Sequence, residues 1–287
     1  MVQLYDRATA KIICSLKTHT KKVTAVLATA SLNGDGLPSF LVSSSLDKSV
    51  RVWAPNGTKS GYSAAANLAH GGEVNALALH PTDTLVASAA ADGTWSIIDL
   101  ASAKPSILLT VSLPADAPDG TANTAIAFHP DGKLLGVGSS DSVIRFFDIV
   151  TGSCLKTFDG HAAGAISSLS FSENGYSLAS SALGSSEVKL WDLREGKPAC
   201  SHTLQANSVV HAVAFDTSAQ FLAAAGTDLR VFGYKKANKV VSWDQLVVAE
   251  DNQAELTAAA WGPDGNELAV AGMDRTVRFL SKPAATA

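Results

Sequence analysis

Short runs of apolar or alternating apolar and polar residues fill the chain, and glycine, proline, asparagine and aspartate separate them. Residues 187–192, with the sequence EVKLWD, and residues 74–79, with the sequence VNALAL, are typical of these runs. Alternation with a period of two places successive side chains on opposite faces of an extended strand, whereas a helix requires a period of about 3.6. Because no long stretch has the helical period, the pattern predicts an all-β protein made of short strands.

The turns between these runs are of two kinds. Turns of the first kind lie between two apolar runs and combine proline, asparagine or glycine: 80–83 (HPTD), 129–132 (HPDG), 172–175 (SENG) and 262–265 (GPDG). Proline presets the φ angle of a turn, and glycine and asparagine tolerate a positive φ, so these segments predict hairpins. Turns of the second kind carry an aspartate and lead into a third run: Asp47, Asp92, Asp141 and Asp274. Each unit of the pattern therefore predicts three strands joined by two hairpins.

A bulky residue recurs near the end of each third run. The residues at this register are Tyr5, Trp53, Ile98, Phe147, Trp191, Phe232 and Leu280, which follow one another at intervals of 41 to 49 residues. Periods of about 40 to 45 residues, with four strands and a Trp-Asp ending, are typical of WD-repeat propeller blades. We therefore predict that residues 1–287 form a single WD-repeat β-propeller domain, in which these bulky residues pack between neighbouring blades.

The number of blades follows from the number of strand sets. Six sets of three strands are predicted to begin near Val23, Val74, Thr124, Ile166, Val209 and Leu256. Residues 1–17 supply only the last two strands of a further blade, so we predict seven blade positions with the first blade incomplete. The alternative is a six-bladed ring in which Ile12–Leu16 is the outer strand of the last blade.

The repeat also explains a group of residues that resembles a nucleophile set. A histidine precedes the first strand, a serine among Ser43–Ser45 lies on the second, an aspartate lies in the next turn and a tryptophan on the third, which is similar to the structural tetrad of WD repeats. Such a network satisfies buried polar groups that otherwise cost about 1–3 kcal/mol each. A second repeat keeps only part of the set, because Ser185 stands where the aspartate is expected. We predict a structural role, and no catalytic one, for His19, Asp47, Trp53, His161 and Trp191.

Composition narrows the classes of function. The 287 residues carry a formal net charge of −4, which does not suit the neutralisation of a phosphate backbone, so no direct contact with nucleic acid is expected. No apolar stretch approaches the roughly 18 residues of a membrane span. The cysteines Cys14, Cys154 and Cys200 are odd in number and widely spaced, which indicates a reducing compartment and no metal site.

Motifs for phosphate, metal or nucleophile chemistry are missing from the sequence. It contains no G-x-x-x-x-G-K-[ST], H-E-x-x-H, C-x-x-C or G-x-S-x-G motif. Residues 136–138, with the sequence GVG, lack the third glycine and the following helix of a dinucleotide site. We therefore predict a binding platform without a cofactor.

Several repeats contain sequence segments that are more specific to one family than the general repeat pattern is. The segments that carry the resemblance occur in this order: KTHTKKVT (17–24), FSENGY (171–176), VKLWDLR (188–194), GTD (226–228) and GMDR (272–275). Together with a tryptophan inside a third strand at Trp95 and a shortened hairpin after Gly226, they resemble the C-terminal propeller of the pre-mRNA-processing factor 19 family. The similarity extends through essentially the whole chain.

This resemblance implies a nuclear subunit of the NineTeen complex, which activates and stabilises the spliceosome, with spliceosomal proteins as partners. The family ligates ubiquitin through an N-terminal U-box and forms homo-oligomers through a coiled coil. Neither pattern is found in this sequence, so the resemblance implies recognition of substrates or partners rather than ligase chemistry. Two alternatives stay open: a WD-repeat adaptor of another ubiquitin-ligase or signalling complex, and a propeller hydrolase or lyase with its site in the central channel.

The turn at residues 172–176 is the candidate for partner binding. The turn geometry requires only Asn-Gly or a similar pair, so Glu173 and Tyr176 exceed what a hairpin needs. Tyrosine is also enriched at the hot spots of interfaces. We predict Glu173, Asn174 and Tyr176 as contacts for a peptide of a splicing partner. The alternative is that Tyr176 packs over its own blade and Glu173 is a solvated turn residue.

Overall fold

The computed structural model describes residues 1–6, 9, 11–34, 36–58, 61–102, 104–162, 164–194, 200–205, 209–237, 240–249 and 254–281. Within these ranges the chain forms strands and turns without any helix, so the prediction of an all-β protein is confirmed. No helix that is long and apolar enough to cross a membrane occurs in this part of the chain.

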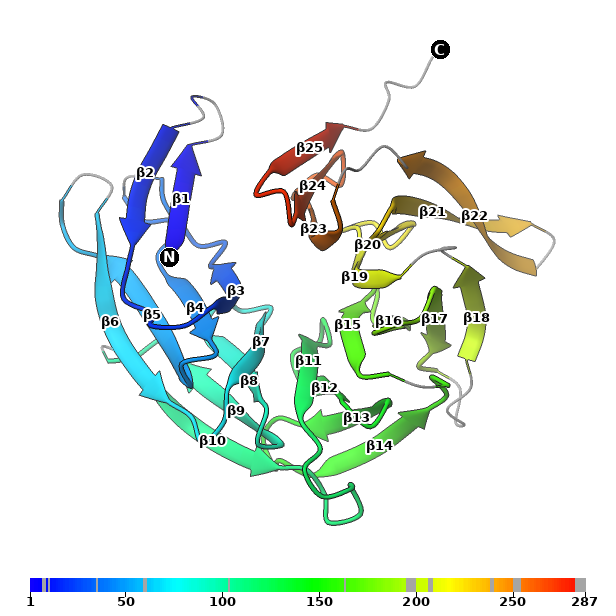
Figure 1. The fold of residues 1–287 in the computed structure, drawn as a ribbon, viewed down its shortest axis with the longest axis horizontal. Helices are drawn as coiled ribbons and strands as arrows, with labels where there is room; N and C mark the ends of the chain where they lie inside the picture. The colour runs from blue at the N-terminus through cyan, green and yellow to red at the C-terminus, as the bar shows by residue number, and fades with distance from the viewer. Residues whose placement is uncertain are drawn as a thin grey trace. The chain divides into compact units, whose positions relative to one another are not determined.

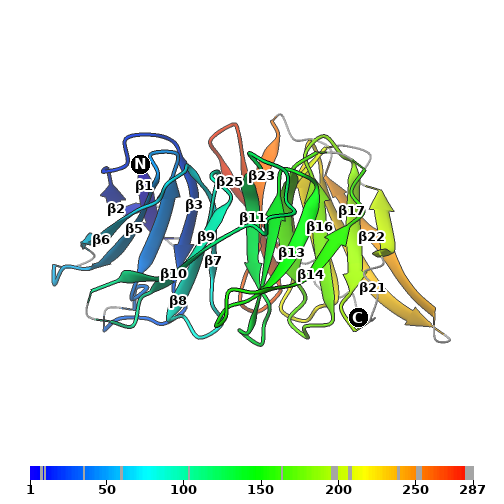
Figure 2. The same ribbon diagram turned by 90° about the horizontal axis from the view of Figure 1, so that it is seen from below.

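The strands of the described residues form seven sheets, in each of which neighbouring strands are consecutive in sequence (Figures 1 and 2). The first sheet contains two strands, β1 (Val2–Asp6) and β2 (Lys11–Leu16). Two sheets of four strands follow, β3 (Val23–Ala28), β4 (Leu41–Ser45), β5 (Ser49–Pro55) and β6 (Tyr62–Ala69), then β7 (Val74–Leu79), β8 (Leu85–Ala90), β9 (Thr94–Asp99) and β10 (Ser106–Ser112).

Three further four-stranded sheets have the same order. They are β11 (Asn123–Phe128), β12 (Leu134–Ser139), β13 (Val143–Asp148) and β14 (Cys154–Asp159); β15 (Ile166–Phe171), β16 (Ser177–Ala182), β17 (Glu187–Asp192) and β18 (Cys200–Gln205); and β19 (Val210–Phe215), β20 (Phe221–Gly226), β21 (Leu229–Ala237) and β22 (Val240–Ala249). The last sheet contains three strands, β23 (Leu256–Trp261), β24 (Glu267–Gly272) and β25 (Val277–Ser281).

These sheets are the expected propeller blades. Six sheets of three or four strands begin at or next to the residues predicted from the sequence, and the sheet before them has only two strands. The prediction of an incomplete first blade is therefore confirmed. In the six-bladed alternative, Ile12–Leu16 is the outer strand of the last blade, but the structure places this segment in the two-stranded sheet, paired with β1.

Two compact units make up the chain. The first consists of Met1–Phe128, Gly132–Ser139 and Phe146–Leu155, and the second of His129–Asp131, Ser140–Arg145 and Lys156–Ala287. Each unit has its own hydrophobic clusters between neighbouring sheets. In the first unit, Trp53 packs with Val2 and Leu16 of the two-stranded sheet. In the second, Leu190 of one sheet packs with Leu222 of the next.

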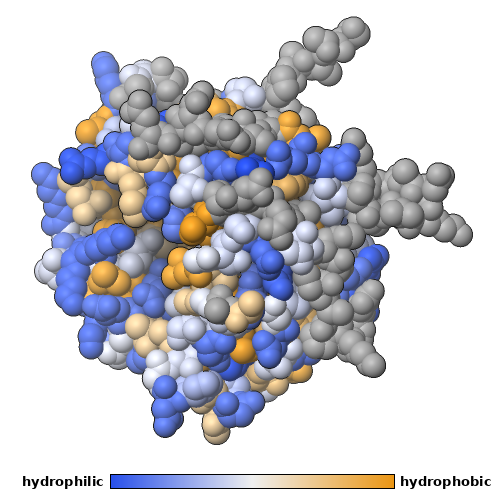
Figure 3. Space-filling model, turned by 45° about the vertical axis from the view of Figure 1, so that its right-hand side comes forward, coloured by the Kyte–Doolittle hydropathy of each residue, from blue (hydrophilic) through white to orange (hydrophobic). Residues whose placement is uncertain are grey.

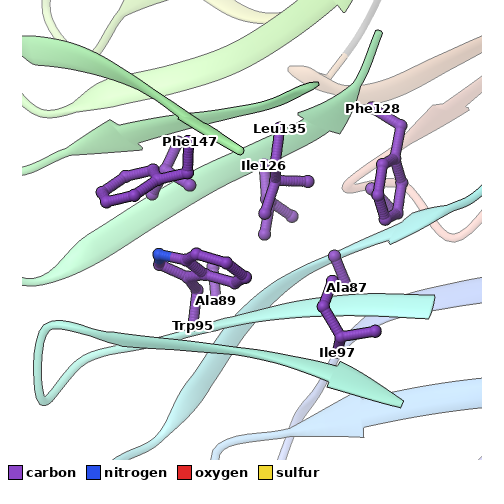
Figure 4. Packing of buried hydrophobic residues seen from close by; sticks show 10 residues of the cluster. Ala87, Ala89, Trp95, Ile97, Ile126, Phe128, Leu135 and Phe147 are labelled. Atoms are coloured by element: carbon purple, nitrogen blue, oxygen red, sulfur yellow. The ribbon is translucent and has the colours of Figure 1, made fainter. Parts of the chain in front are cut away.

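One cluster of the first unit shows how neighbouring blades share a core (Figure 4). Trp95 and Ile97 of β9 face Ile126 and Phe128 of β11, and all four side chains are buried. The ring of Trp95 also lies 5.2 Å from the ring of Phe147, measured between centroids. Alternate side chains of a strand point towards the neighbouring blade, so both blades supply apolar side chains to the core between them.

Polar side chains also join neighbouring blades at the first strand of three sheets. In the first unit, the Thr24 hydroxyl donates to the carbonyl of Val74 (2.7 Å), and the Asn75 amide donates to the carbonyl of Asn123 (2.8 Å). In the second unit, the Ser167 hydroxyl donates to the carbonyl of Val210 (3.2 Å). Each donor is the second residue of its strand, so the same position repeats the same link.

The bulky residues of the repeat are buried in the four-stranded sheets only. Trp53, Ile98, Phe147, Trp191 and Phe232 are all buried, as predicted. Tyr5 and Leu280 are 54% and 38% exposed, so the prediction that they pack between blades is wrong. They lie in the sheets of two and three strands, which offer less neighbouring surface to cover a side chain.

The surface shown in Figure 3 carries its apolar residues in small groups among polar ones. Scattered apolar residues are normal on a protein surface. A row of them on an edge strand is different, because unpaired backbone groups and apolar side chains together favour pairing with another chain. In the described residues β25 pairs with β24 alone, and Val277 and Phe279 on it are more than half exposed.

Val277→Lys should therefore reduce self-association, since a charge on an edge strand opposes strand pairing. Light scattering at increasing protein concentration measures the effect, and less aggregate than in the wild type is expected. The matched control is Val150→Lys, because Val150 is 83% exposed but lies in a turn rather than on an edge strand. Equal aggregation of the wild type and Val277→Lys would exclude β25 as the associating edge.

Candidate functional site

The turn that joins β15 and β16 is held by its own side chains. The side chain of Asn174 accepts a hydrogen bond from the Ser172 hydroxyl (2.8 Å) and one from the backbone N–H of Tyr176 (3.0 Å). Ser172 is buried, and its hydroxyl also accepts from the backbone N–H of Ser177 (2.9 Å). Gly175 has a φ of 73°, which a side chain rarely tolerates. Asn174 is thus a turn former, whereas the side chain of Tyr176 projects with about half of its surface exposed.

The end of β17 lies beside this turn. Arg194 donates from its Nε to Asp192 (2.9 Å) and also pairs with it through a terminal nitrogen. Its guanidinium lies over the ring of Tyr176, 5.2 Å from the centroid, in a cation–π contact. The hydrogen bond between the two side chains lowers the pKa of Asp192 and raises the pKa of Arg194. The ion pair therefore stays charged at neutral pH, with the arginine fixed beside the tyrosine.

The next sheet supplies an aromatic wall. The ring of Trp243 on β22 lies 5.9 Å from Phe215 at the end of β19 and 5.5 Å from Tyr234 on β21, and both pairs meet edge to face. The turn after β19 is fixed by Asp216, which is buried and accepts from the backbone N–H groups of Gln220 (2.9 Å) and Phe221 (2.8 Å). Gln220 in turn accepts the backbone N–H of Tyr234 at its carbonyl (2.7 Å).

A pocket of about 330 Å³ lies between these two sheets of the second unit. Its lining residues are Ser172, Asn174, Tyr176, Ser177, Leu190, Asp192, Arg194, Phe215, Ser218, Ala219, Gln220, Tyr234 and Trp243. The structure thus brings Asn174 and Tyr176 into one pocket, whereas Glu173 lies exposed on the same turn and does not line it. Hydroxyl and amide groups surround the aromatic rings, so the pocket suits an apolar side chain attached to a polar backbone.

Sequence reasoning missed the residues of the other walls. Arg194 was part of the Trp-Asp motif but was not predicted as a site residue, and Phe215, Tyr234 and Trp243 were not predicted either. These residues lie 18 to 67 positions beyond Tyr176 in the sequence. The sequence contained a partial signal for Arg194, because this residue follows the end of a predicted strand, where neither the strand nor the Trp-Asp motif requires a charge.

The histidine networks of the repeats lie inside the blades. In the first unit, His19 lies 2.9 Å from Asp47 through Nδ1 and 2.8 Å from the Ser43 hydroxyl through Nε2, and Trp53 donates to the same hydroxyl (3.0 Å). Burial raises the pKa of Asp47, but the hydrogen bonds from Ser49 and His19 outweigh it, so the pKa lies well below its usual value. Ser43 is fully buried, so no substrate reaches its hydroxyl.

The network of the second unit lacks the aspartate. His161 lies 2.8 Å from the Ser180 hydroxyl, to which Trp191 donates its indole N–H (2.8 Å). The ring of Trp191 also packs on Phe158, with 5.1 Å between centroids. Because the hydroxyl accepts from the indole, it is free to donate its own proton to a neutral imidazole. Burial and, to a lesser extent, the charge of Lys189 lower the pKa of His161 from 6.5 to about 4.

Metal binding finds no support in the described part of the chain, where no group of three or more His, Cys, Asp or Glu side chains could hold an ion. Cys14 and Cys154 form no disulfide in this part of the chain, whereas the side chain of Cys200 lies outside the described residues.

The architecture and the Trp–Ser–His networks define a class of protein, and comparison with known families agrees with it. The family described as WD domain, G-beta repeat matches residues 10–54, 64–99, 120–148, 152–192 and 243–280. These segments cover more than half of the chain, and each ends at or next to the end of a third strand. The chain therefore belongs to the WD-repeat family, and the predicted WD-repeat β-propeller class is confirmed.

The relatives of the chain are more specific than this class. It is 37% identical over 284 residues to pre-mRNA-processing factor 19 homolog 2 of Arabidopsis thaliana, which covers 98% of this chain and 50% of that protein. It is 34% identical to pre-mRNA-processing factor 19 of Oryza sativa subsp. japonica and of Mus musculus, with 98% of this chain and 51% of each relative covered. The chain spans about half the length of these relatives and matches their WD-repeat portion, so the predicted resemblance is confirmed.

A solved structure supports the fold alone. One chain of a structure described as "Crystal Structure of Mitotic Checkpoint Complex" matches with a TM-score of 0.77 and 17% sequence identity, covering 97% of this chain and 80% of that one.

The stability of the networks can be tested at their tryptophans. Trp191→Ala and Trp53→Ala should each lower the free energy of unfolding by about 3–5 kcal/mol, because each removes a buried ring and leaves a cavity. Thermal or denaturant unfolding measures the loss. An unchanged melting temperature with loss of partner binding would contradict a structural role for these residues.

The network of His161 also predicts a dependence of stability on pH. The pKa of His161 is about 4 in the folded protein and about 6.5 when it is exposed. Between these values the unfolded chain binds more protons than the folded one, so the free energy of unfolding should fall as the pH is lowered from about 6.5 towards 4. The loss attributable to this residue should reach about 3 kcal/mol at most. Urea unfolding at several pH values measures it.

The control for this pH dependence is His161→Asn, which has no titrating group at this position. The variant should be less stable than the wild type at pH 7 and should lose less stability between pH 7 and pH 5. A variant with the same pH slope as the wild type would show that other groups, such as His70, whose pKa is also lowered by burial, cause the dependence.

Proposed function

We propose that this chain is a protein-interaction module that serves pre-mRNA splicing. Its similarity to pre-mRNA-processing factor 19 proteins over 98% of its length supports the process. A WD-repeat propeller is a rigid scaffold whose loops and edges bind other proteins, which supports an interaction role over a catalytic one. The partners on this proposal are proteins of the spliceosome and of its NineTeen complex, and the location is the nucleus.

The pocket beside Tyr176 is the proposed binding site. Tyrosine, tryptophan and arginine are the residues most enriched at interface hot spots, and the pocket combines Tyr176, Tyr234, Trp243 and Arg194. Its volume of about 330 Å³ is at the lower end of the range for pockets that bind ligands, which suits one or two side chains of a peptide. Ser177 and Gln220 at its walls offer hydrogen bonds to a peptide backbone.

The role in ubiquitin transfer is proposed from the family resemblance. In that proposal the propeller recognises substrates or partners for a U-box ligase, and the ligase chemistry lies in another module. The contribution of this chain is to bring a protein into the complex. The observation that carries the proposal is the pocket of aromatic and arginine side chains on a chain related to splicing factors.

The test is affinity capture from nuclear extract with the immobilised chain, followed by mass spectrometry of the bound proteins. Glu173→Ala combined with Tyr176→Ala should reduce capture of splicing proteins at least tenfold, because loss of a hot-spot side chain costs about 2 kcal/mol or more. This variant spares Gly175 and Asn174, which the turn needs, so the blade should stay folded.

The matched control is Tyr5→Ala. Tyr5 is 54% exposed and Tyr176 is 53% exposed, so the two substitutions remove similar solvent-accessible rings. Tyr5→Ala should leave capture unchanged. Capture of splicing proteins at the wild-type level by the folded double variant would exclude this pocket as their binding site.

A further inference from the structure

A histidine from the preceding sheet reaches the turn that carries Asn174 and Tyr176. His129 directly follows β11, and its Nε2 lies 2.9 Å from the carbonyl oxygen of Gly175. Because a carbonyl only accepts, Nε2 carries the hydrogen of this bond. The imidazole ring also meets the ring of Phe171 edge to face, with 5.3 Å between centroids. His129 thus contacts both the end of β15 and the turn that follows it.

The other ring nitrogen keeps the imidazole in this orientation. Nδ1 of His129 accepts from the backbone N–H of Asp131 (3.2 Å) when the ring is neutral, and it donates to the Asp131 carboxylate, 2.8 Å away, when the ring is protonated. Both contacts come from the turn of His129 itself. Only Nε2 is therefore left to bind across to the next blade, and the side chain is mostly buried in this position.

The turn on the receiving side is shaped for this contact. A Cβ atom at residue 175 would lie 2.8 Å from Nε2 of His129, so the ring approaches closely because residue 175 is glycine. The N–H of Gly175 donates to the carbonyl of Ser172 (2.8 Å), while its carbonyl accepts from His129. Gly175 lies between Asn174 and Tyr176, so holding its peptide group determines where both neighbours point.

We infer that His129 is a positioning residue of the pocket beside Tyr176. It fixes the carbonyl of Gly175 and thereby the direction in which the Tyr176 side chain projects beside Arg194. This inference rests on the proposed function of the pocket, but it concerns a residue that does not line the pocket.

The chain contains the same contact a second time, away from this pocket. In the first unit, Nε2 of His80 lies 3.0 Å from the carbonyl of Gly132, and its ring meets Phe128 edge to face at 5.0 Å. Gly132 has a φ of 73°, as Gly175 has. His80 does not contact the turn of Asn174 and Tyr176, so it is a matched control for the structural cost of losing such a contact.

The experiment compares His129→Phe with His80→Phe. Phenylalanine keeps a ring for the packing on Phe171 or Phe128 and removes the N–H donor. His129→Gln restores a donor and serves as the rescue variant. Two quantities are measured on the full chain: amide hydrogen exchange in residues 172–177, and capture from nuclear extract of the splicing proteins that the wild-type chain holds.

In His129→Phe, amide exchange within residues 172–177 should be roughly three- to tenfold faster, the effect of losing one hydrogen bond, and capture should fall by a similar factor. His80→Phe should leave both quantities at the wild-type level in spite of a similar change in melting temperature. His129→Gln should recover most of the capture. Unchanged exchange at residues 172–177 in His129→Phe would overturn the inference.

The capture result separates this inference from the proposed function. If Tyr176→Ala loses capture and His129→Phe keeps it, the pocket binds the partner and the positioning role of His129 is wrong. If neither variant loses capture, the pocket is not the site and the inference falls with it. Equal loss of capture in His80→Phe and His129→Phe would also overturn it, because general destabilisation would then explain both.

Discussion

Burial of a large side chain at the end of the third strand in each four-stranded sheet is the constraint on which the rest of the structure depends. Trp191 illustrates it: the indole packs against Phe158, an outer-strand residue of the preceding sheet, and lies so close to Gly160 that a Cβ there would be 2.9 Å away. A single sheet of four short strands cannot bury both of its faces. Each blade is therefore stable only against a neighbour, and the bulky residue is the part of each blade that the neighbour covers.

The polar network behind that residue follows from the same burial. An indole N–H taken out of water needs an acceptor, and a serine of the second strand supplies it in the sheets of Trp53 and Trp191. The serine in turn needs a partner, which is His19 or His161. In the sheet of Phe147 no indole has to be satisfied, and Asp141 of the corresponding turn pairs with the buried Arg145 instead (2.6 Å). The motif therefore varies with the buried polar groups of each blade, and the indole N–H of Trp95, which is buried, has no hydrogen-bond partner.

The candidate site consists of residues that the packing between blades does not require. The positions that a blade needs for packing are occupied by buried residues, so the side chains that a partner can reach lie at the surface. Tyr176, Arg194 and Trp243 line one pocket between two neighbouring sheets, and the guanidinium of Arg194 lies over the ring of Tyr176. The contact of His129 with the carbonyl of Gly175 joins the turns of two successive blades.

The repeat can be predicted from the sequence, because strand period, turn chemistry and the spacing of bulky residues are local properties of the chain. The sequence predicted the first strands at Val23, Val74 and Leu256 and the incomplete first sheet. It also predicted that Asn174 helps to form the turn between two strands and that the turn does not require Tyr176. The exposure of Tyr5 and Leu280 could not be predicted in this way, because burial depends on how much neighbouring surface a sheet has in the folded protein. The tertiary structure alone placed Arg194, Tyr234 and Trp243 beside Tyr176, since the position of a side chain relative to another blade follows from the packing of sheets and not from the period of a strand.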